Sequence, residues 1–147
     1  LVDRINMLAE ENLPITLSVS LHAPNNEIRN TIMPVNKKYP VETLIKACRE
    51  YIKKTGRRIS FEYALISGVN DSDKEAHELA NLLRGMLCHI NLIPVNNVEE
   101  RNYHKGSVEK INHFRDKLIS LGMNATVRRE LGSDISASCG QLRKKVL

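Results

Sequence analysis

Apolar and polar residues alternate in several short segments of the chain, as they do in β-strands that bury one face. In residues 15–22 the odd positions carry Ile, Leu, Val and Leu, and the even positions carry Thr, Ser, Ser and His. In residues 59–66 the odd positions carry Ile, Phe, Tyr and Leu, and they oppose a serine and Glu62. The same alternation appears in residues 124–128, and residues 89–95 are apolar enough for a fourth strand. These segments predict four strands.

The stretches between the predicted strands have apolar residues three and four positions apart, which is typical of amphipathic helices. Pro40 suits a first helical position, and Gly56 suits the end of the same helix. Ser72 and Glu75 form a capping box for the next helix. Further helices are expected at the N-terminus, from Asn25 or Asn26 to a point before Pro34, and between Ser107 and Gly122.

Strands that alternate with helices imply right-handed crossovers and a parallel sheet, so the expected fold class is α/β. Parallel strands are usually apolar on both faces, whereas one face is polar here. A curved sheet with outer helices and a polar interior explains this pattern, because a lumen that holds a polar ligand tolerates such residues. Four strands are too few to close a ring, so we expect part of a (β/α) barrel. Glu62 would face the lumen and could orient a ligand, and we assign it no catalytic role.

Composition narrows the class of protein further. The 147 residues suit one domain, and 22 Lys and Arg against 17 Asp and Glu give a formal net charge of +5. Basic clusters such as Lys37-Lys38 and Arg128-Arg129 could contact phosphates, although solvated helix ends and loops explain each of them equally well. Three widely spaced cysteines, no signal peptide and no long apolar run favour a cytoplasmic protein without a membrane segment. Because the chain starts at Leu1, inside a helical apolar stripe, we expect a fragment of a longer protein.

One thiol near the C-terminus is a candidate nucleophile. Cys139 lies among small residues, in Ser136-Ala137-Ser138-Cys139-Gly140, after a strand-like segment and downstream of two arginines. Nearby positive charge favours the nucleophilic thiolate, and small neighbours leave room for another molecule. A loop cysteine without a role is the plainer interpretation of these residues alone. Cys48 continues a helical apolar face and Cys88 stands at a strand entrance, so we expect both in the core.

Two further stretches lie where parallel strands should end, and ligands bind at those ends. Ser20, Leu21 and His22 end the first strand, and Asn96 follows the third. Ser20 and His22 should project to the same side and could hydrogen-bond a ligand, and the amide of Asn96 both donates and accepts. Taken alone, His22 is better explained as a capping or core histidine. The other histidines lack the spacing of zinc ligands, so no metal site is expected.

Three separated stretches resemble the radical S-adenosylmethionine (SAM) RNA adenine-C2 methyltransferases, and they occur in the same order as in that family. The matching residues are Ser20-Leu21-His22, Pro94-Val95-Asn96 and Cys139-Gly140-Gln141-Leu142, supported by Glu27-Ile28-Arg29 and Met33-Pro34-Val35-Asn36-Lys37. The resemblance covers nearly the whole chain. It implies that residues 1–147 are the C-terminal part of a partial radical-SAM barrel, with the cluster-binding half and an N-terminal accessory domain outside this chain.

The resemblance also implies roles for the candidate residues. Cys139 would carry a methyl group as S-methylcysteine, and Ser20, Leu21, His22 and Asn96 would bind SAM. A second SAM on a 4Fe-4S cluster, with ligands outside this chain, would supply a 5′-deoxyadenosyl radical. The implied substrate is carbon-2 of an adenine in 23S rRNA, with tRNA in some relatives, and the electron donor would be a protein such as flavodoxin. Because the chain has no C-x-x-x-C-x-x-C segment, we expect it to be inactive alone, and we expect the whole enzyme to be a monomer.

Three alternatives stay open at this point. The nearest is a carbon-8 rRNA adenine methyltransferase, an antibiotic-resistance relative of the same family. A non-catalytic RNA-binding module would be supported by the basic clusters alone. A barrel enzyme with a Schiff-base lysine is disfavoured, because no lysine falls within the four predicted core strands.

Overall fold

The computed structural model describes residues 2–128, which form a four-stranded sheet in the order β1-β2-β3-β4. The strands are β1 (Leu17–Ser20), β2 (Ile59–Leu65), β3 (Cys88–Pro94) and β4 (Ala125–Val127). Each strand pairs in parallel with the next one along the chain, so every connection crosses from one end of the sheet to the other. The expected α/β class and the parallel sheet are confirmed.

The crossovers carry the helices that the apolar spacing predicts. They are α1 (Val2–Glu11), α2 (Asn26–Ile32), α3 (Val41–Thr55), α4 (Asp73–Leu83) and α5 (Val108–Ser120), with short 3-10 turns η1 (Pro34–Lys37) and η2 (Glu99–Arg101). The capping box of Ser72 and Glu75 is present at α4, and Ser107 caps α5. Gly56 ends α3 in the left-handed region, at φ 66°. Pro40 is the residue before α3 and not its first residue.

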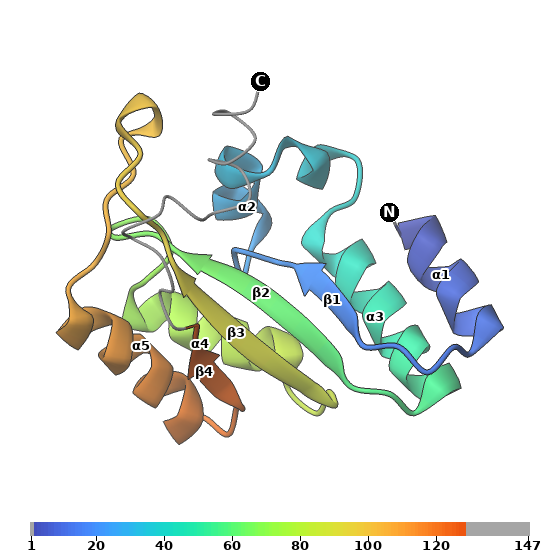
Figure 1. Ribbon diagram of the computed structural model, residues 1–147. Helices are drawn as coiled ribbons and strands as arrows, with labels where there is room; N and C mark the ends of the chain where they lie inside the picture. The colour runs from blue at the N-terminus through green and yellow to red at the C-terminus, as the bar shows by residue number, and fades with distance from the viewer. Residues whose placement is uncertain (1, 129–147) are drawn as a thin grey trace.

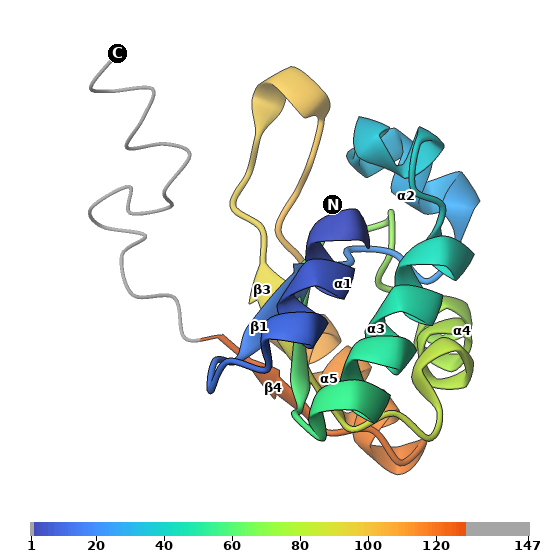
Figure 2. The ribbon, with the colours of Figure 1, turned by 90° about the vertical axis from the view of Figure 1, so that its right-hand side faces the viewer.

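The long helices cover one face of the sheet. α3, α4 and α5 lie behind the strands in Figure 1, and the turned view shows them together on one side of the sheet (Figure 2). The odd-numbered residues of β2 point into this layer, and Ile59, Phe61 and Tyr63 are fully buried there. Since the even-numbered residues lie on the opposite face, alternation along the strands separates an apolar core from a polar surface.

The first strand is shorter than the sequence suggests. Residues 15–22 were expected to be extended, whereas β1 begins at Leu17, because Leu17 pairs with Ile59, the first residue of β2. The chain before β1 forms a tight turn, in which the N–H of Ile15 donates to the carbonyl oxygen of Leu13 at 2.8 Å. At the other end, β1 stops at Ser20, so Leu21 and His22 follow the strand and are not part of it.

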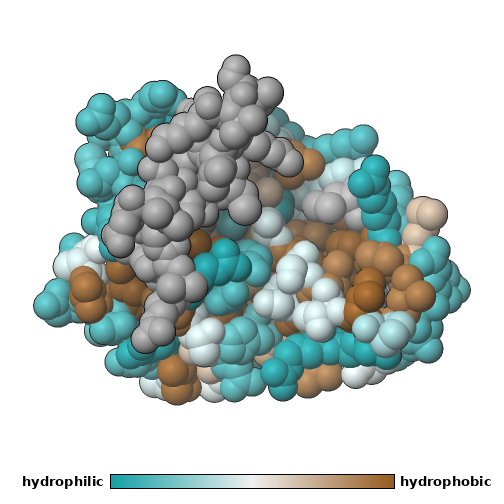
Figure 3. Space-filling model, viewed as in Figure 1, coloured by the Kyte–Doolittle hydropathy of each residue, from teal (hydrophilic) through white to brown (hydrophobic). Residues whose placement is uncertain are grey.

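An apolar flank lies beside β1. Met7, Leu13 and Ile15 are 40–64% exposed, and brown surface gathers at the side of the molecule that carries α1 and β1 (Figure 3). Toward the middle of the same view the surface becomes pale and teal. Within residues 2–128, no helix has the length and apolar character that crossing a membrane requires.

Candidate functional site

A row of polar side chains crosses the open face of the sheet. Ser20 pairs in register with Glu62, Glu62 with Asn91, and Asn91 with Thr126. Because paired residues of neighbouring strands lie on the same face, the four side chains form one row. A carboxylate oxygen of Glu62 accepts a hydrogen bond from Arg128 at 3.2 Å. The polar face expected from the sequence therefore exists, and Glu62 points to it with an ion pair already formed.

The chain changes direction where β1 ends. The N–H groups of Leu21 and His22 both donate to the carbonyl oxygen of Glu62, at 2.9 and 3.4 Å. Two successive residues thus share one acceptor, and the regular ladder cannot continue beyond them. Leu21 is fully buried, which anchors the turn in the core.

His22 has a conformation that few residues other than glycine adopt. Its φ is 62°, in the left-handed region, which costs roughly 1–2 kcal/mol for a residue with a Cβ. The Nδ1 atom accepts a hydrogen bond from the N–H of Ala64 at 2.8 Å. The alternation that placed Ser20 and His22 on one side of the strand therefore does not extend to His22, whose ring reaches sideways to β2.

This hydrogen bond determines how His22 can contact a ligand. Burial, followed by the nearby positive charge of Arg29, lowers the pKa of His22 to about 4, so the imidazole is neutral near pH 7. Since Nδ1 accepts a hydrogen bond from the N–H of Ala64, the proton of the neutral ring resides on Nε2. His22 thus offers a hydrogen-bond donor at Nε2 and no positive charge.

A buried arginine holds the turn from behind. The guanidinium of Arg29 donates to the carbonyl oxygens of Leu21 at 2.9 Å and Ser20 at 3.1 Å, and to Oδ1 of Asn36 at 2.8 Å. Arg29 is 0% exposed, and burial lowers its pKa from the usual value. All its hydrogen-bond partners among residues 2–128 are neutral oxygens, so the positive charge is stabilised by dipoles and lies directly beneath the end of β1.

Asn70 is a second buried residue at this place. Its side-chain amide donates to the carbonyl oxygens of His22 and Ala64, at 2.8 and 2.7 Å, and its Oδ1 accepts from the N–H of Ile66 at 2.8 Å. The stretch Gly68-Val69-Asn70-Asp71 predicts only a turn, and sequence reasoning missed the contact of Asn70 with His22. One sequence signal could have indicated this contact: Asn70 lies between an apolar strand and a capping box. An asparagine buried at such a position needs several hydrogen-bond partners.

Asn96 and Ser20 complete the set of candidate residues within the described range. Asn96 is half-buried and lies two residues beyond β3, so it stands at the same edge of the sheet as His22. Neither its amide nor the hydroxyl of Ser20 has a hydrogen-bond partner among residues 2–128. Cys139 lies outside the described residues. The arrangement therefore presents a hydroxyl, an imidazole N–H and an amide along the carboxyl ends of β1 and β3.

The described residues do not fit a 4Fe-4S cluster. No group of three or more His, Cys, Asp or Glu side chains among residues 2–128 could hold a metal ion. Cys48 and Cys88 are buried, as the sequence predicts. Burial raises the pKa of Cys48 to about 12, with a further contribution from Cys88, and burial also raises the pKa of Cys88. Cluster ligands are thiolates, which these two environments disfavour.

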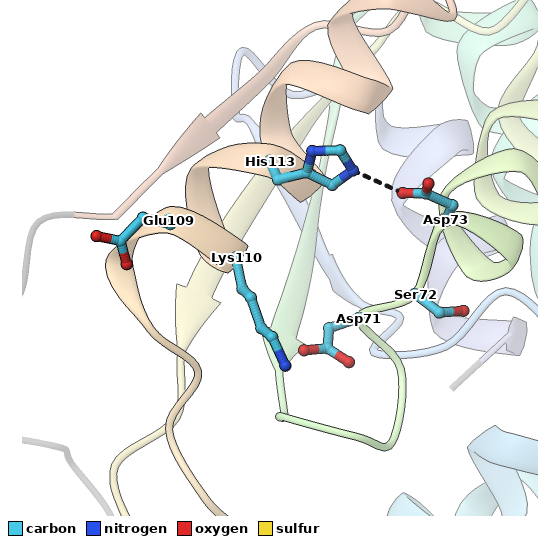
Figure 4. A pocket seen from close by; sticks show the side chains of 6 residues that line it. All are labelled: Asp71, Ser72, Asp73, Glu109, Lys110 and His113. Atoms are coloured by element: carbon cyan, nitrogen blue, oxygen red, sulfur yellow. Dashed lines mark hydrogen bonds and ion pairs between the residues drawn. The ribbon is translucent and has the colours of Figure 1, made fainter.

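A separate pocket of about 490 Å³ lies between the N-terminal parts of α4 and α5. It is lined by Asp71, Ser72, Asp73, Glu109, Lys110 and His113 (Figure 4). His113 and Asp73 are joined across it at 2.9 Å, and both side chains are more than half exposed. The pocket lies away from the open face and combines surface side chains, so it is not part of the site at the strand ends.

No family model matches the chain. The whole chain aligns with "Probable dual-specificity RNA methyltransferase RlmN" of Alkaliphilus oremlandii at 61% identity and covers 43% of that protein. The structure superposes on a radical SAM methyltransferase from Sphaerobacter thermophilus with a TM-score of 0.91 and 54% identity, covering 96% of this chain and 41% of the other. A domain of pyruvate-formate lyase-activating enzyme from Bacteroides vulgatus, at 21% identity and a TM-score of 0.68, shares the fold alone over 86% of this chain and 74% of that one.

Sequence and fold therefore agree that the chain is similar, over nearly its whole length, to part of a radical SAM methyltransferase. Several curated relatives are named probable dual-specificity RNA methyltransferases. The chain spans less than half the length of these relatives.

Proposed function

We propose that the protein containing this chain methylates carbon-2 of an adenine in 23S rRNA, with tRNA as a second substrate. The alignment of the whole chain with part of a dual-specificity RNA methyltransferase supports an RNA substrate, and it favours an enzyme over a non-catalytic RNA-binding module. The stretch Pro94-Val95-Asn96 resembles the carbon-2 enzymes more than their carbon-8 relatives, which favours carbon-2 as the methylated atom. Residues 1–147 are proposed to be the C-terminal part of a radical-SAM barrel. A segment outside the chain would pack against the apolar flank of Met7, Leu13 and Ile15.

The observation that carries the proposal is the set of polar groups at the strand ends. SAM carries a sulfonium, a ribose, an adenine and a zwitterionic amino acid portion, and hydroxyl, amide and N–H groups can bind the last three. These groups are the hydroxyl of Ser20, the Nε2–H of His22 and the amide of Asn96. None of the three has a hydrogen-bond partner among residues 2–128. Leu21 would act indirectly, by anchoring the turn between Ser20 and His22, because its side chain is fully buried, its N–H donates to Glu62 and its carbonyl oxygen accepts from Arg29. A neutral His22 suits a cationic cofactor, because a charged imidazole would repel the sulfonium.

The buried charge of Arg29 supports the binding of the amino acid portion. Its guanidinium lies beneath the carbonyl groups of Ser20 and Leu21, and among residues 2–128 no carboxylate pairs with it. An uncompensated positive charge inside the protein attracts an anion at the adjacent surface. The carboxylate of SAM would therefore favour the end of β1, with its sulfonium directed away.

Cys139 is the proposed nucleophile of the reaction. Its thiolate sulfur would accept the methyl group of SAM, forming S-methylcysteine and releasing S-adenosylhomocysteine, which is a covalent catalytic role. SAM supplies both the methyl group and, when it is cleaved reductively on a 4Fe-4S cluster, the radical chemistry. The cluster ligands would lie outside this chain, since the described residues do not fit them. Residues of this chain would then hold SAM and carry the methyl group.

The proposal is tested with the full-length protein, SAM, a reductant and 23S rRNA. Cys139→Ala should abolish methylation of adenine carbon-2, and mass spectrometry of the wild-type Cys139 peptide should find one added methyl group. His22→Ala and Asn96→Ala should weaken SAM binding. Cys48→Ala is the matched control, because that thiol is buried and unused, and it should retain activity. Full methylation by Cys139→Ala, or a methyl group on carbon-8, would overturn the proposed function.

A further inference from the structure

The edge of β2 extends beyond the end of β1. The carbonyl of Glu62 faces β1, because it accepts from Leu21 and His22. Backbone groups of alternate residues point to the same side of a strand, so those of Ala64 and Ile66 face the same way. β1 has already ended at Ser20, and its backbone cannot pair with them. These groups need other partners, since buried backbone groups are rarely left unpaired.

The side chain of Asn70 supplies these partners in the pattern of a strand. Its amide donates to the carbonyl oxygen of Ala64 at 2.7 Å, and its Oδ1 accepts from the N–H of Ile66 at 2.8 Å. In a parallel ladder, one residue donates to residue i of its neighbour and accepts from residue i+2, which is the same arrangement. The carboxamide of Asn70 therefore replaces a peptide group and extends the ladder past the end of β1.

Asn70 itself is firmly held. It is 0% exposed, and its backbone carbonyl oxygen accepts a hydrogen bond from the hydroxyl of Tyr63 at 2.7 Å. The orientation of its amide is fixed by its partners, because two carbonyl oxygens can bind only the nitrogen and one N–H can bind only the oxygen. Asn70 thus has one conformation that satisfies all its neighbours.

The same amide reaches His22. Its nitrogen donates to the carbonyl oxygen of His22 at 2.8 Å, while the N–H of Ala64 donates to Nδ1 of the imidazole. Asn70 therefore binds both the backbone of His22 and the residue that orients its ring. Because His22 has a φ of 62°, its conformation depends on such contacts from its surroundings.

We propose that Asn70 is a positioning residue for His22, which keeps the imidazole at the end of β1 with its proton on Nε2. This inference rests on the proposed role of His22 in binding SAM. An aspartate in place of Asn70 has nearly the same shape, but its carboxylate cannot donate to the carbonyl oxygens of Ala64 and His22. The imidazole would then lose its fixed partner and exchange its proton between the two ring nitrogens.

The experiment uses full-length protein that carries ¹⁵N-labelled histidine. Two-dimensional NMR distinguishes protonated from unprotonated ring nitrogens, and His22→Asn identifies the signals of His22. The wild-type protein should show an unprotonated Nδ1 and a protonated Nε2 at pH 7, whereas Asn70→Asp and Asn70→Ser should show averaged nitrogens. SAM binding to both variants should weaken roughly three- to tenfold, the effect of one lost hydrogen bond.

A control variant that also destabilises the fold, at a residue away from His22, separates a positioning role of Asn70 from general destabilisation. Leu118 on α5 is fully buried and is not part of the hydrogen-bond network around His22. Leu118→Ala should therefore lower the melting temperature and leave the His22 tautomer unchanged. A folded Asn70 variant that retains the wild-type tautomer overturns the inference, whatever its affinity for SAM. Unchanged SAM binding by His22→Ala would instead overturn the cofactor role of His22, so the two failures are distinguishable.

Discussion

The Nδ1 atom of His22 accepts a hydrogen bond from the backbone N–H of Ala64 at 2.8 Å, a donor that faces the side of β2 where β1 has already ended. Burial, and then the nearby charge of Arg29, lower the pKa of this imidazole, so its protonated form is unfavourable in the folded protein. The lowered pKa links the candidate site to the pH dependence of stability.

Stability should fall in mild acid because of His22. Its pKa is about 4 in the folded protein and about 6.5 in the unfolded chain. Between these values the unfolded state binds the additional proton, so the free energy of unfolding decreases as the pH falls from 6.5 toward 4. The contribution, up to about 3 kcal/mol, is fully present above pH 6.5.

Denaturant unfolding between pH 4 and 7.5 measures this effect. His22→Asn is the comparison, because asparagine tolerates the left-handed conformation and does not titrate. The difference in free energy of unfolding between wild type and variant should shrink as the pH falls. A difference that stays constant across this range would contradict a lowered pKa at His22.

Arg29→Lys should destabilise the fold although it preserves the charge. A lysine cannot donate to Ser20, Leu21 and Asn36 together in the fork geometry of a guanidinium, so buried acceptors lose their partners. We expect a loss of about 2–4 kcal/mol in the free energy of unfolding. Arg84→Lys, at an exposed position, is the matched control and should change it by less than about 0.5 kcal/mol.

Cys48 and Cys88 should resist alkylation in the folded protein. Both are at most 7% exposed, and burial raises the pKa of each thiol, so little thiolate is present at pH 8. Iodoacetamide followed by peptide mass spectrometry should find both unmodified under native conditions and both modified in denaturant. Rapid native labelling of either thiol would show that the layer between α3 and β3 opens readily.

Gly56→Ala should cost about 1–2 kcal/mol, because Gly56 ends α3 at φ 66°. No heavy atom lies within 4 Å of the added Cβ, so the expected loss is purely conformational. Gly106→Ala is the control: its φ is outside the left-handed region, and a Cβ there would meet its nearest neighbour at an ordinary 3.8 Å. Thermal unfolding should separate the two variants, and equal melting temperatures would be inconsistent with this explanation.

The contact between His113 and Asp73, in the pocket between α4 and α5, should contribute little to stability. The two side chains are 65% and 58% exposed, and even exposed ion pairs contribute at most about 1 kcal/mol. His113→Gln should therefore change the free energy of unfolding by less than about 0.5 kcal/mol. Phe114, the next residue, serves as the comparison because its ring is buried against Tyr63. Phe114→Ala should lower the free energy of unfolding by about 3–5 kcal/mol.

The architecture was predictable because it depends on local and periodic signals. Alternation of period two identified the face of β2 that carries Phe61, and the capping box at Ser72 identified the start of α4. Strand ends were less predictable, because β1 ends according to its pairing with β2 and not according to its own residues. Pairing is a property of the sheet that no single segment contains.

The residues that organise the candidate site were the least predictable. Arginine is rarely buried without a carboxylate, so the sequence of α2 gave no reason to place Arg29 in the interior. Asn70 follows a strand and precedes a helix, where a turn is sufficient explanation. Both roles depend on carbonyl groups that become neighbours only when β1 and β2 lie side by side, and local sequence patterns do not encode that proximity.

The complete burial of Leu21 between Ser20 and His22 restricts how far the chain can vary in length at the end of β1. One residue added or deleted here would push the leucine toward solvent and draw a polar neighbour into the hydrophobic interior. No residue of the connection at positions 97–106 is buried, so added residues there disturb no core, and each doubling of loop length costs only about 0.6 kcal/mol. Insertions among relatives should therefore accumulate after the third strand and be absent after the first.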